Sequence, residues 1–237
     1  MMISNSRWRI KLVVSGCLFQ KDTRQTIRIG KGLILKIAVL VSGSGTNLQT
    51  LIEQLHQDET SGIDIAVVLS DRRKAYALTR AKRVGIPTHV VRTQDYENRL
   101  DFDAEISRVI EQYAVELIVL AGFMKLFQPP FVQKYRNRII NVHPTLLPAF
   151  PGAHPVADTL AYGVKIAGIT VHFVDEDVDS GPIIAQSTVP VLDTDDEESL
   201  HNRIQVEEHK LYPQVIKWYA QGKLKIEGRK VIVKREN

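Results

Sequence analysis

The stretch Lys36–Asn47, KIAVLVSGSGTN, decides the fold of this 237-residue chain. Its first half, through Val41, is a continuous apolar run, as expected of a strand that is buried on both faces of a sheet. Two glycines follow, at positions 43 and 45, and a helical pattern then begins. A strand, a glycine loop and a helix in this order open a βαβ unit, which predicts a parallel sheet.

The same alternation continues along the chain. Apolar runs predict strands at Ile37–Val41, Ile63–Leu69, Thr88–Val91, Leu117–Leu120, Arg138–Asn141, Ile169–Val174 and Ile183–Val189. Helical patterns occupy Asn47–Gln57, Ala75–Val84 and Asp103–Tyr113, and a C-terminal helix over Glu198–Gln221 precedes a hairpin over Lys223–Lys234. The later strands follow one another closely, which indicates a mixed sheet there. We expect an α/β fold with a doubly wound, mainly parallel, Rossmann-like sheet and mixed C-terminal strands.

The length and the hydrophobic content of 44% fit one sizeable domain. We assign residues 36–237 to a single catalytic domain and residues 1–35 to a basic extension. The extension holds seven Lys and Arg residues and one Asp, whereas the whole chain has a net charge of +4. The remainder is therefore slightly acidic, which argues against nucleic-acid binding.

The extension has two interpretations. It is either a flexible leader or an upstream start, with translation beginning at a non-Met codon near Leu33–Leu35, or it is an extra strand or a targeting segment. The single cysteine, Cys17, excludes an intrachain disulfide and fits a reducing compartment. No apolar run approaches the roughly 20 residues of a membrane helix. We expect a cytoplasmic protein without a membrane partner, with organellar targeting by the extension as the alternative.

The glycine loop, Ser42–Asn47, suits an anion, because glycines let backbone N–H groups approach a ligand and the following helix adds unpaired donors. It lacks the Gly-Lys-Ser/Thr of a Walker loop and the third glycine of a dinucleotide fingerprint. The alternative is a tight turn with Thr46 or Asn47 as helix N-cap.

A second candidate site follows the strand at 138–141, where Asn141 and His143 are two residues apart and therefore share one face of an extended chain. An amide that stabilises an oxyanion and an imidazole that moves a proton suit acyl transfer. Asp179, in the acidic loop at 175–182, is a candidate partner that would fix the tautomer of His143. The alternatives for this loop are solvated turn residues or a calcium site, although the spacing lacks EF-hand order.

A third segment, Ala121–Phe127, follows the strand at 117–120, and ligands of open α/β sheets bind at such strand ends. Met124, Leu126 and Phe127 either wall a flat heterocycle or pack under a loop. Elsewhere, His172 is interpreted as a structural histidine and His154 as a supporting residue of the site. No His-Glu-x-x-His or cysteine pair is present, so we expect no metal.

Taken together, these segments resemble the folate-dependent phosphoribosylglycinamide formyltransferase family over about 36–218. The segments that carry the resemblance are KIAVLVSGSGTN, VLAGFMKLF, NVHPTLLPAFPG, ITVHFVDEDVDSGPIIAQ and RIQVEEHKLYP. The resemblance implies transfer of a formyl group from 10-formyltetrahydrofolate, as co-substrate, to the amine of glycinamide ribonucleotide in purine biosynthesis. The departures are the extension and His154-Pro155-Val156, which is similar to the related methionyl-tRNA formyltransferases and formyltetrahydrofolate deformylases.

The resemblance also implies roles for individual residues. The catalytic set is Asn141, His143 and Asp179. The ribonucleotide site comprises Gly45, Thr46, Asn47, Gln205 and Glu208. The folate site comprises Arg99, Met124, Lys125, Leu126, Phe127, Asn141, Asp175 and Val178. We expect small-molecule substrates and a monomer or homodimer. A formyltetrahydrofolate hydrolase and a non-enzymatic nucleotide-binding regulator are the alternatives.

Overall fold

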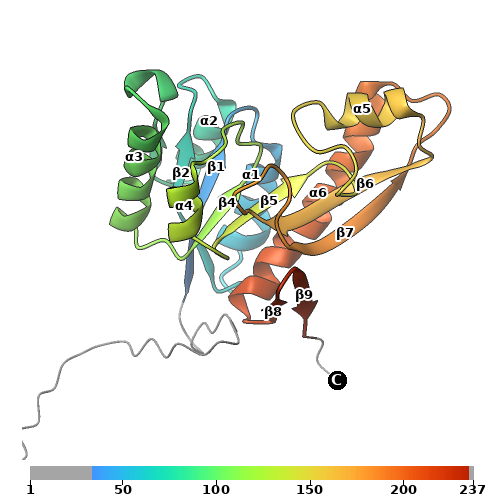
Figure 1. Ribbon diagram of the computed structural model, residues 1–237. Coiled ribbons are helices and arrows are strands. Elements are labelled where there is room, and N and C mark those ends of the chain that lie inside the picture. Colours follow the sequence, from blue (N-terminus) through green and yellow to red (C-terminus); the bar gives the residue numbers. More distant parts are fainter. Residues whose placement is uncertain (1–33, 235–237) are drawn as a thin grey trace, which may run out of the picture.

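Strand β1 (Leu35–Val41) lies near the middle of a seven-stranded sheet in the computed structural model, which describes residues 34–234 (Figure 1). The strand order is β3-β2-β1-β4-β5-β6-β7. Strands β1 to β5 pair in parallel, and β6 and β7 join antiparallel. The expected α/β class, the mainly parallel sheet and the mixed later strands are thus confirmed. The remaining strands are β2 (Ile63–Ser70), β3 (Thr88–Val90), β4 (Leu117–Leu120), β5 (Ile139–His143), β6 (Ile166–Phe173) and β7 (Ile183–Pro190).

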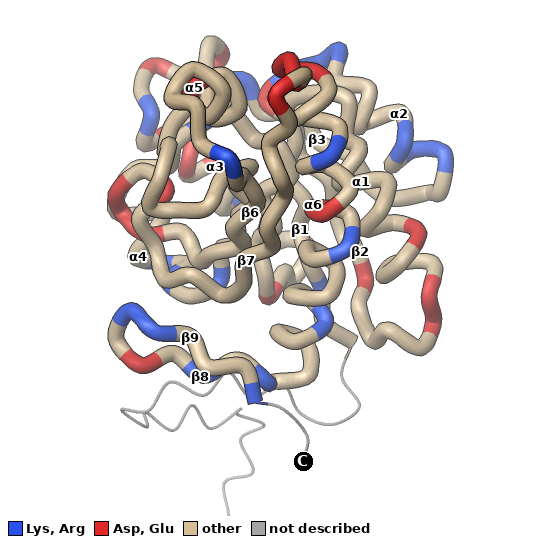
Figure 2. Tube along the Cα trace, turned by 90° about the vertical axis from the view of Figure 1, so that its right-hand side faces the viewer, with Lys and Arg blue, Asp and Glu red and all other residues tan. Residues whose placement is uncertain are grey.

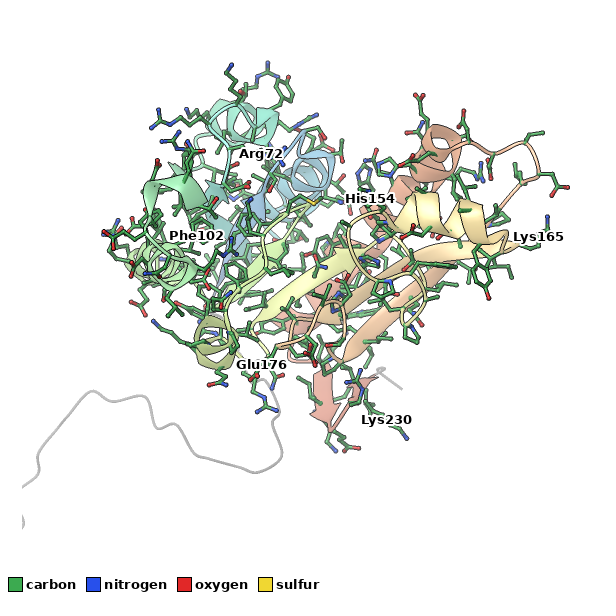
Figure 3. The ribbon with its side chains drawn as sticks, turned by 45° about the horizontal axis from the view of Figure 1, so that its top comes forward. Arg72, Phe102, His154, Lys165, Glu176 and Lys230 are labelled. Carbon is green, nitrogen blue, oxygen red and sulfur yellow. The ribbon has the colours of Figure 1, made fainter. Side chains whose placement is uncertain are left out.

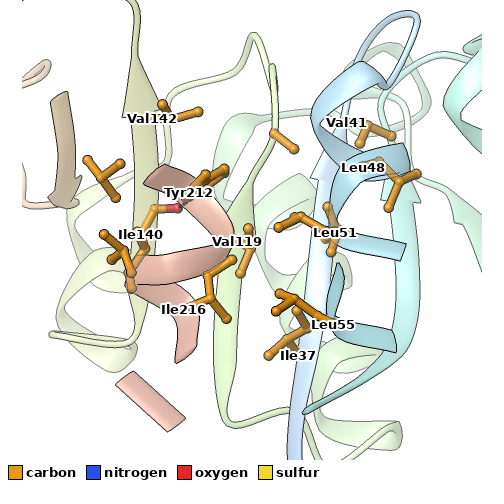
Figure 4. Packing of buried hydrophobic residues seen from close by; sticks show 14 of the residues in the cluster. Ile37, Val41, Leu48, Leu51, Leu55, Val119, Ile140, Val142, Tyr212 and Ile216 are labelled. Carbon is orange, nitrogen blue, oxygen red and sulfur yellow. Dashed lines mark hydrogen bonds between the residues drawn. The ribbon is translucent and has the colours of Figure 1, made fainter. Parts of the chain in front are cut away.

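Side chains of β1 alternate between two hydrophobic cores, as a strand with a period of two requires. Ile37 and Val39 pack with α1 (Thr46–Leu51), the π-helical turn η1 (Ile52–His56), α2 (Tyr76–Arg83) and α6 (Glu197–Ala220), a core seen closely in Figure 4. Ala38 and Leu40 face the opposite core, under α3 (Arg99–Gln112) and α4 (Pro129–Lys134). This double burial explains why the first strand carries no polar residue after Lys36.

Several element boundaries differ from the expected ones. Leu35, assigned to the extension, is fully buried in β1, so the folded body begins before residue 36. Helix α5 (Pro155–Tyr162), helix α4 and the 3-10 turn η2 (Thr93–Asp95) were not expected, since each is short and lacks several turns of apolar spacing. The hairpin is present as β8 (Leu224–Glu227) and β9 (Lys230–Val233). Interpretations of residues 1–33 lie outside the described residues.

Helix α6 connects the core to the strand ends. The buried hydroxyl of Tyr212 lies 2.9 Å from the carbonyl oxygens of both Leu120 and Ile140, on β4 and β5. Pro213 has no N–H for the carbonyl of His209, and Gln54 Nε2 lies 3.4 Å from that oxygen instead. Among residues 34–234, no helix combines the length and apolar character needed to cross a bilayer.

Candidate active site at the strand ends

The polar face of β5 and β6 forms the centre of the candidate site. Ile140 and Val142 point into the core under α6, so Asn141 and His143 point to the other face. The antiparallel register places Asn141 opposite His172 and His143 opposite Thr170. The extension of β5 to His143 therefore brings the predicted amide and imidazole onto one face.

His143 contacts the predicted carboxylate. Its Nδ1 lies 3.3 Å from Oδ2 of Asp179, and its Nε2 lies 2.9 Å from the carbonyl oxygen of Phe150. The same Asp179 oxygen accepts the N–H of Gly152 at 2.9 Å. Both ring nitrogens of His143 thus face acceptors, an arrangement that an imidazolium satisfies with two N–H groups. Asp179 has a φ of 50°, a conformation that a non-glycine residue seldom adopts.

His172 orients the amide of Asn141. Its Nδ1 lies 2.9 Å from the carbonyl oxygen of Phe173, which can only accept, so this nitrogen carries the proton. Nε2 then accepts from Asn141 Nδ2 at 3.3 Å, and burial lowers the pKa of His172, which favours this neutral ring. The second N–H of the amide makes no hydrogen bond within the described residues. His172 is therefore structural, as interpreted, but its contact with Asn141 was not foreseen, since only the register between β5 and β6 shows it.

The glycine loop and α6 form the second part of the site. Thr46 Oγ1 accepts from Gln205 Nε2, and Glu208 Oε2 accepts from Asn47 Nδ2, each at 2.8 Å. Four of the five residues expected at the ribonucleotide thus lie together, although α1 and α6 are about 160 positions apart in the sequence. The interpretation of Thr46 or Asn47 as N-cap is wrong, because Gly45 is the N-cap and no side chain caps the helix.

Gly45 is required by its surroundings. Its φ is +73°, and a Cβ there would lie 2.5 Å from Cβ of Ala77 on α2. Arg80 of the same helix donates to the carbonyl of Ser44 at 2.9 Å. The glycine loop and the start of α1 are thus contacted by two helices, α2 through Ala77 and Arg80 and α6 through Gln205 and Glu208.

Glu208 is a buried carboxyl with one protein partner. Burial raises its pKa to about 7, and the hydrogen bond from Asn47 opposes this only in part. Oδ1 of Asn47 is also buried, and within residues 34–234 it has no hydrogen-bond partner. Such groups keep unused hydrogen-bonding capacity, which a hydroxyl-rich ligand can satisfy.

The predicted folate segment lies beside the glycine loop. The N–H of Met124 donates to Ser42 Oγ at 2.9 Å, and Arg99 NH2 donates to the carbonyl of Leu126. Met124 and Leu126 are 66% and 62% exposed, whereas Phe127 is buried between Phe123 and Phe131. The packing interpretation is thus confirmed for Phe127, whereas a role of Met124 and Leu126 as the wall of a ligand site stays a prediction.

The other predicted residues surround this centre. Asp175 accepts from Ser180 Oγ and so shapes the loop that carries Asp179. Val178 in the same loop is exposed. The side chain of Lys125, in the loop after β4, is partly exposed. His154 is exposed at the start of α5, seen in Figure 3, and has no contact with the catalytic set. Within residues 34–234, no group of three or more His, Cys, Asp or Glu side chains could hold a metal ion.

Fold and site together define an α/β group-transfer enzyme. It has an anion-suited loop after β1, an amide and an imidazole on β5, and a carboxylate in the loop after β6. The comparisons with known proteins agree. The chain belongs to the formyl transferase family, whose model matches residues 35–216.

Named relatives and a solved structure show which members of the formyl transferase family this chain is similar to. A phosphoribosylglycinamide formyltransferase of Escherichia coli (strain K12) is 40% identical over 192 residues, which cover 81% of this chain and 90% of that protein. The human trifunctional purine biosynthetic protein adenosine-3 is 41% identical over 191 residues, and this chain spans only 19% of its length. The crystal structure of glycinamide ribonucleotide transformylase 1 from Symbiobacterium toebii matches with a TM-score of 0.83 and 46% identity, covering 86% of this chain and 95% of that chain.

Proposed function

We propose that this protein transfers the formyl group of 10-formyltetrahydrofolate to the amine of glycinamide ribonucleotide, a step of purine biosynthesis. The observation that carries the proposal is the convergence of Asn141, His143 and Asp179, linked through His172, at strand ends two strands from the glycine loop. The names of the relatives supply the glycinamide ribonucleotide and the transfer of a formyl group. The formyl folate donor is inferred from the resemblance to the folate-dependent family.

The ribonucleotide binds between the glycine loop and α6. Gly45, Thr46 and Asn47 offer the phosphate the unpaired N–H groups of a helix start. Gln205 and Glu208, one turn apart on α6, reach the ribose and the glycinamide. The buried, underused polar atoms of Asn47 and Glu208 support this assignment.

The folate binds at the carboxyl end of β4. Met124 and Leu126 wall the pterin, with Phe127 supporting them from below, and Asn141, Asp175 and Val178 line its other side. Lys125 and Arg99 face the anionic glutamate end of the cofactor, because Lys125 belongs to this loop and Arg99 donates to its Leu126 carbonyl.

The chemistry is direct attack. The amine nitrogen forms a bond to the formyl carbon, and the carbonyl oxygen takes the negative charge, which the free N–H of Asn141 and an N–H of His143 stabilise. His143 releases the Phe150 carbonyl to make this contact. The bond from the carbon to the folate nitrogen then breaks, and the proton lost by the amine passes to that nitrogen with the help of Asp179 and His143. Holding both substrates at adjoining strand ends makes the reaction effectively intramolecular.

Steady-state formyl transfer tests the proposal. The purified protein should convert glycinamide ribonucleotide only when the formyl folate is present. Asp179→Asn should lower kcat by roughly 100-fold or more, because it weakens the support of a charged His143, while Asp177→Asn in the same exposed loop should leave it unchanged. Formate release from the folate alone would favour a hydrolase instead, and full activity of Asp179→Asn would contradict the assigned role.

We also infer a cytoplasmic monomer or homodimer that binds these two small molecules and needs no metal, nucleic acid or membrane. Light scattering of the purified protein at several concentrations measures the assembly. Unchanged activity after exhaustive chelation is the expected result for the metal.

A further inference from the structure

The β8–β9 hairpin contacts the loop between β6 and β7, which carries Asp179. Arg229 stands in the two-residue turn of this hairpin, directly after Gly228, whose φ is +59°. Its Nη2 donates to the carbonyl oxygen of Ser180 at 2.5 Å. Figure 2 shows a basic segment at the tip of the hairpin. The reaction proposed above makes no use of Arg229, which lies beyond the residues that the family model matches.

The hairpin is fixed to the body of the protein by apolar packing. Leu224 of β8 is fully buried, and side chains of both strands pack against the main core. Strand β9 lies next to β7, which begins where the loop that carries Asp179 ends (Figure 1). Arg229 is thus an exposed side chain on a well-packed support, so its guanidinium can hold a neighbouring group in one place.

Ser180, which follows Asp179, is held at two of its atoms. Its hydroxyl donates to Asp175 Oδ1 and lies 3.1 Å from the carbonyl oxygen of Asp177, so the loop is braced within itself. Its carbonyl oxygen accepts from Arg229, and no other hydrogen bond ends at this oxygen within residues 34–234. The hairpin is therefore the external support of the backbone on the carboxyl side of Asp179.

Asp179 depends on such support, because its φ of 50° is sparsely populated by non-glycine residues. Its Oδ2 lies 3.3 Å from His143 Nδ1 and 2.9 Å from the backbone nitrogen of Gly152, and its Oδ1 lies 3.8 Å from His172 Nε2. The carboxylate keeps these three contacts only while its backbone stays in place. Without a fixed Ser180 carbonyl, the chain beside Asp179 is free to rotate and to turn the carboxylate away from His143.

We propose that Arg229 is a positioning residue, which fixes the carbonyl of Ser180 and thereby keeps the carboxylate of Asp179 directed at His143. The inference rests on the proposed function, because that function gives Asp179 and His143 their roles. Arg229 acts through Asp179 and contacts neither substrate. Its loss therefore lowers kcat and leaves the binding of both substrates as it is.

The experiment measures kcat and KM for formyl transfer in Arg229→Gln, alone and combined with Asp179→Asn. In the single variant kcat should fall about tenfold, the change expected when one hydrogen bond from a charged donor is lost. The KM of each substrate should stay within about twofold of its wild-type value. The combined variant should have the same kcat as Asp179→Asn alone, because no directed carboxylate is left to position. Arg229→Lys, which keeps the charge and a donor, should recover most of the loss.

Lys230→Gln is the matched control, because it removes the same charge one residue further along the hairpin, opposite Glu227. It should keep the wild-type kcat, and both single variants should unfold at the same temperature. An unchanged kcat in Arg229→Gln, an equal loss in Lys230→Gln, or a further loss on top of Asp179→Asn would overturn the inference. A low kcat of Asp179→Asn would still support the proposed function in each of these cases, whereas absence of formyl transfer by the wild type would overturn that function.

Discussion

The two regions that we propose for the two substrates are formed by different kinds of side chain. At the glycine loop, four polar side chains are joined in two hydrogen-bonded pairs between α1 and α6, and Glu208 is 6% exposed. At the folate segment, Met124 and Leu126 are mostly exposed, and the backbone rather than the side chains is fixed, through Ser42 and Arg99.

This difference teaches how one site can handle two unlike ligands. A buried polar network has one satisfied arrangement, so it selects a ligand with matching donors and acceptors. A flexible thioether and an exposed aliphatic chain adapt to a flat ring at little cost. The glycine-loop end is therefore expected to tolerate few substitutions, and the folate end many.

The largest effect is expected where the two ends meet. His143→Ala removes the ring between Asp179 and the reacting carbonyl, so kcat should fall by about 1000-fold while both substrates still bind. Stopped-flow turnover with separate equilibrium titration of each substrate measures this. His154→Ala, an exposed histidine outside the catalytic set, is the control. Loss of binding at either end, with normal chemistry, would show that His143 belongs to that end.

The second prediction concerns pH and the glycine-loop end. Burial raises the pKa of Glu208 to about 7, so the folded state resists ionisation and wild-type stability is lost as pH rises from the unfolded value of 4.5 to about 7. Glu208→Gln has no such titration. Its free energy of unfolding relative to wild type should therefore rise by about 3 kcal/mol between pH 4.5 and 8, as denaturant melts at several pH values can measure.

Glu207→Gln is the control for this pH series. Lys210 and Ser187 lower the pKa of the Glu207 carboxyl, so the stability that it contributes is present above its unfolded pKa and is lost as pH falls. The relative stability of this variant should accordingly change in the opposite direction. A pH-independent difference for Glu208→Gln would show that this end is less buried than the geometry indicates.

The third prediction tests how tightly the glycine loop is held. Gly45→Ala places a Cβ against Ala77 at a positive φ, which should cost about 2 kcal/mol of stability and weaken ribonucleotide binding more than folate binding. Thermal unfolding and separate titrations check both effects. Gly43→Ala is the matched control, because nothing lies within 4 Å of its added Cβ. Equal effects of the two variants would mean that close packing against α2 is not the constraint.

The smallest effect is expected at the folate end. Met124→Leu should change the KM of the formyl folate by less than about threefold, because an exposed apolar side chain is replaced by one of similar size. Initial rates at varied folate concentration suffice. A tenfold change in the KM of the formyl folate would mean that the folate end does not tolerate substitution better than the glycine-loop end.

Much of the fold and of the candidate site could be predicted from the sequence, because it depends on patterns among residues that are close together in the chain. The apolar run at Ile37–Val41 predicted the central strand, and the spacing of Asn141 and His143 predicted a shared face. The contact between His143 and Asp179 was predicted on chemical grounds, and in the structure Nδ1 of His143 lies 3.3 Å from Oδ2 of Asp179.

Other features depend on long-range packing and could not be predicted in this way. The contact of Asn141 with His172 follows from the pairing of β5 with β6, and the joining of Asn47 to Glu208 follows from how α6 crosses the sheet. Thr46 looked like an N-cap because of its residue type, but its hydroxyl accepts from Gln205 instead. The preference of threonine for the N-cap position is not realised here, because Gln205 of α6 donates to the Thr46 hydroxyl oxygen.

Helix α6 fixes the position of the glycine loop relative to the ends of β4 and β5. It presents Gln205, Glu208 and Tyr212 along one side, the first two to the glycine loop and the third to the ends of β4 and β5. A single residue inserted between Glu208 and Tyr212 would rotate one part of this side by about 100° relative to the other, so the contacts with the glycine loop and with the strand ends could not all be kept. A change in the length of this part of α6 would therefore disturb the glycine loop and the strand ends together.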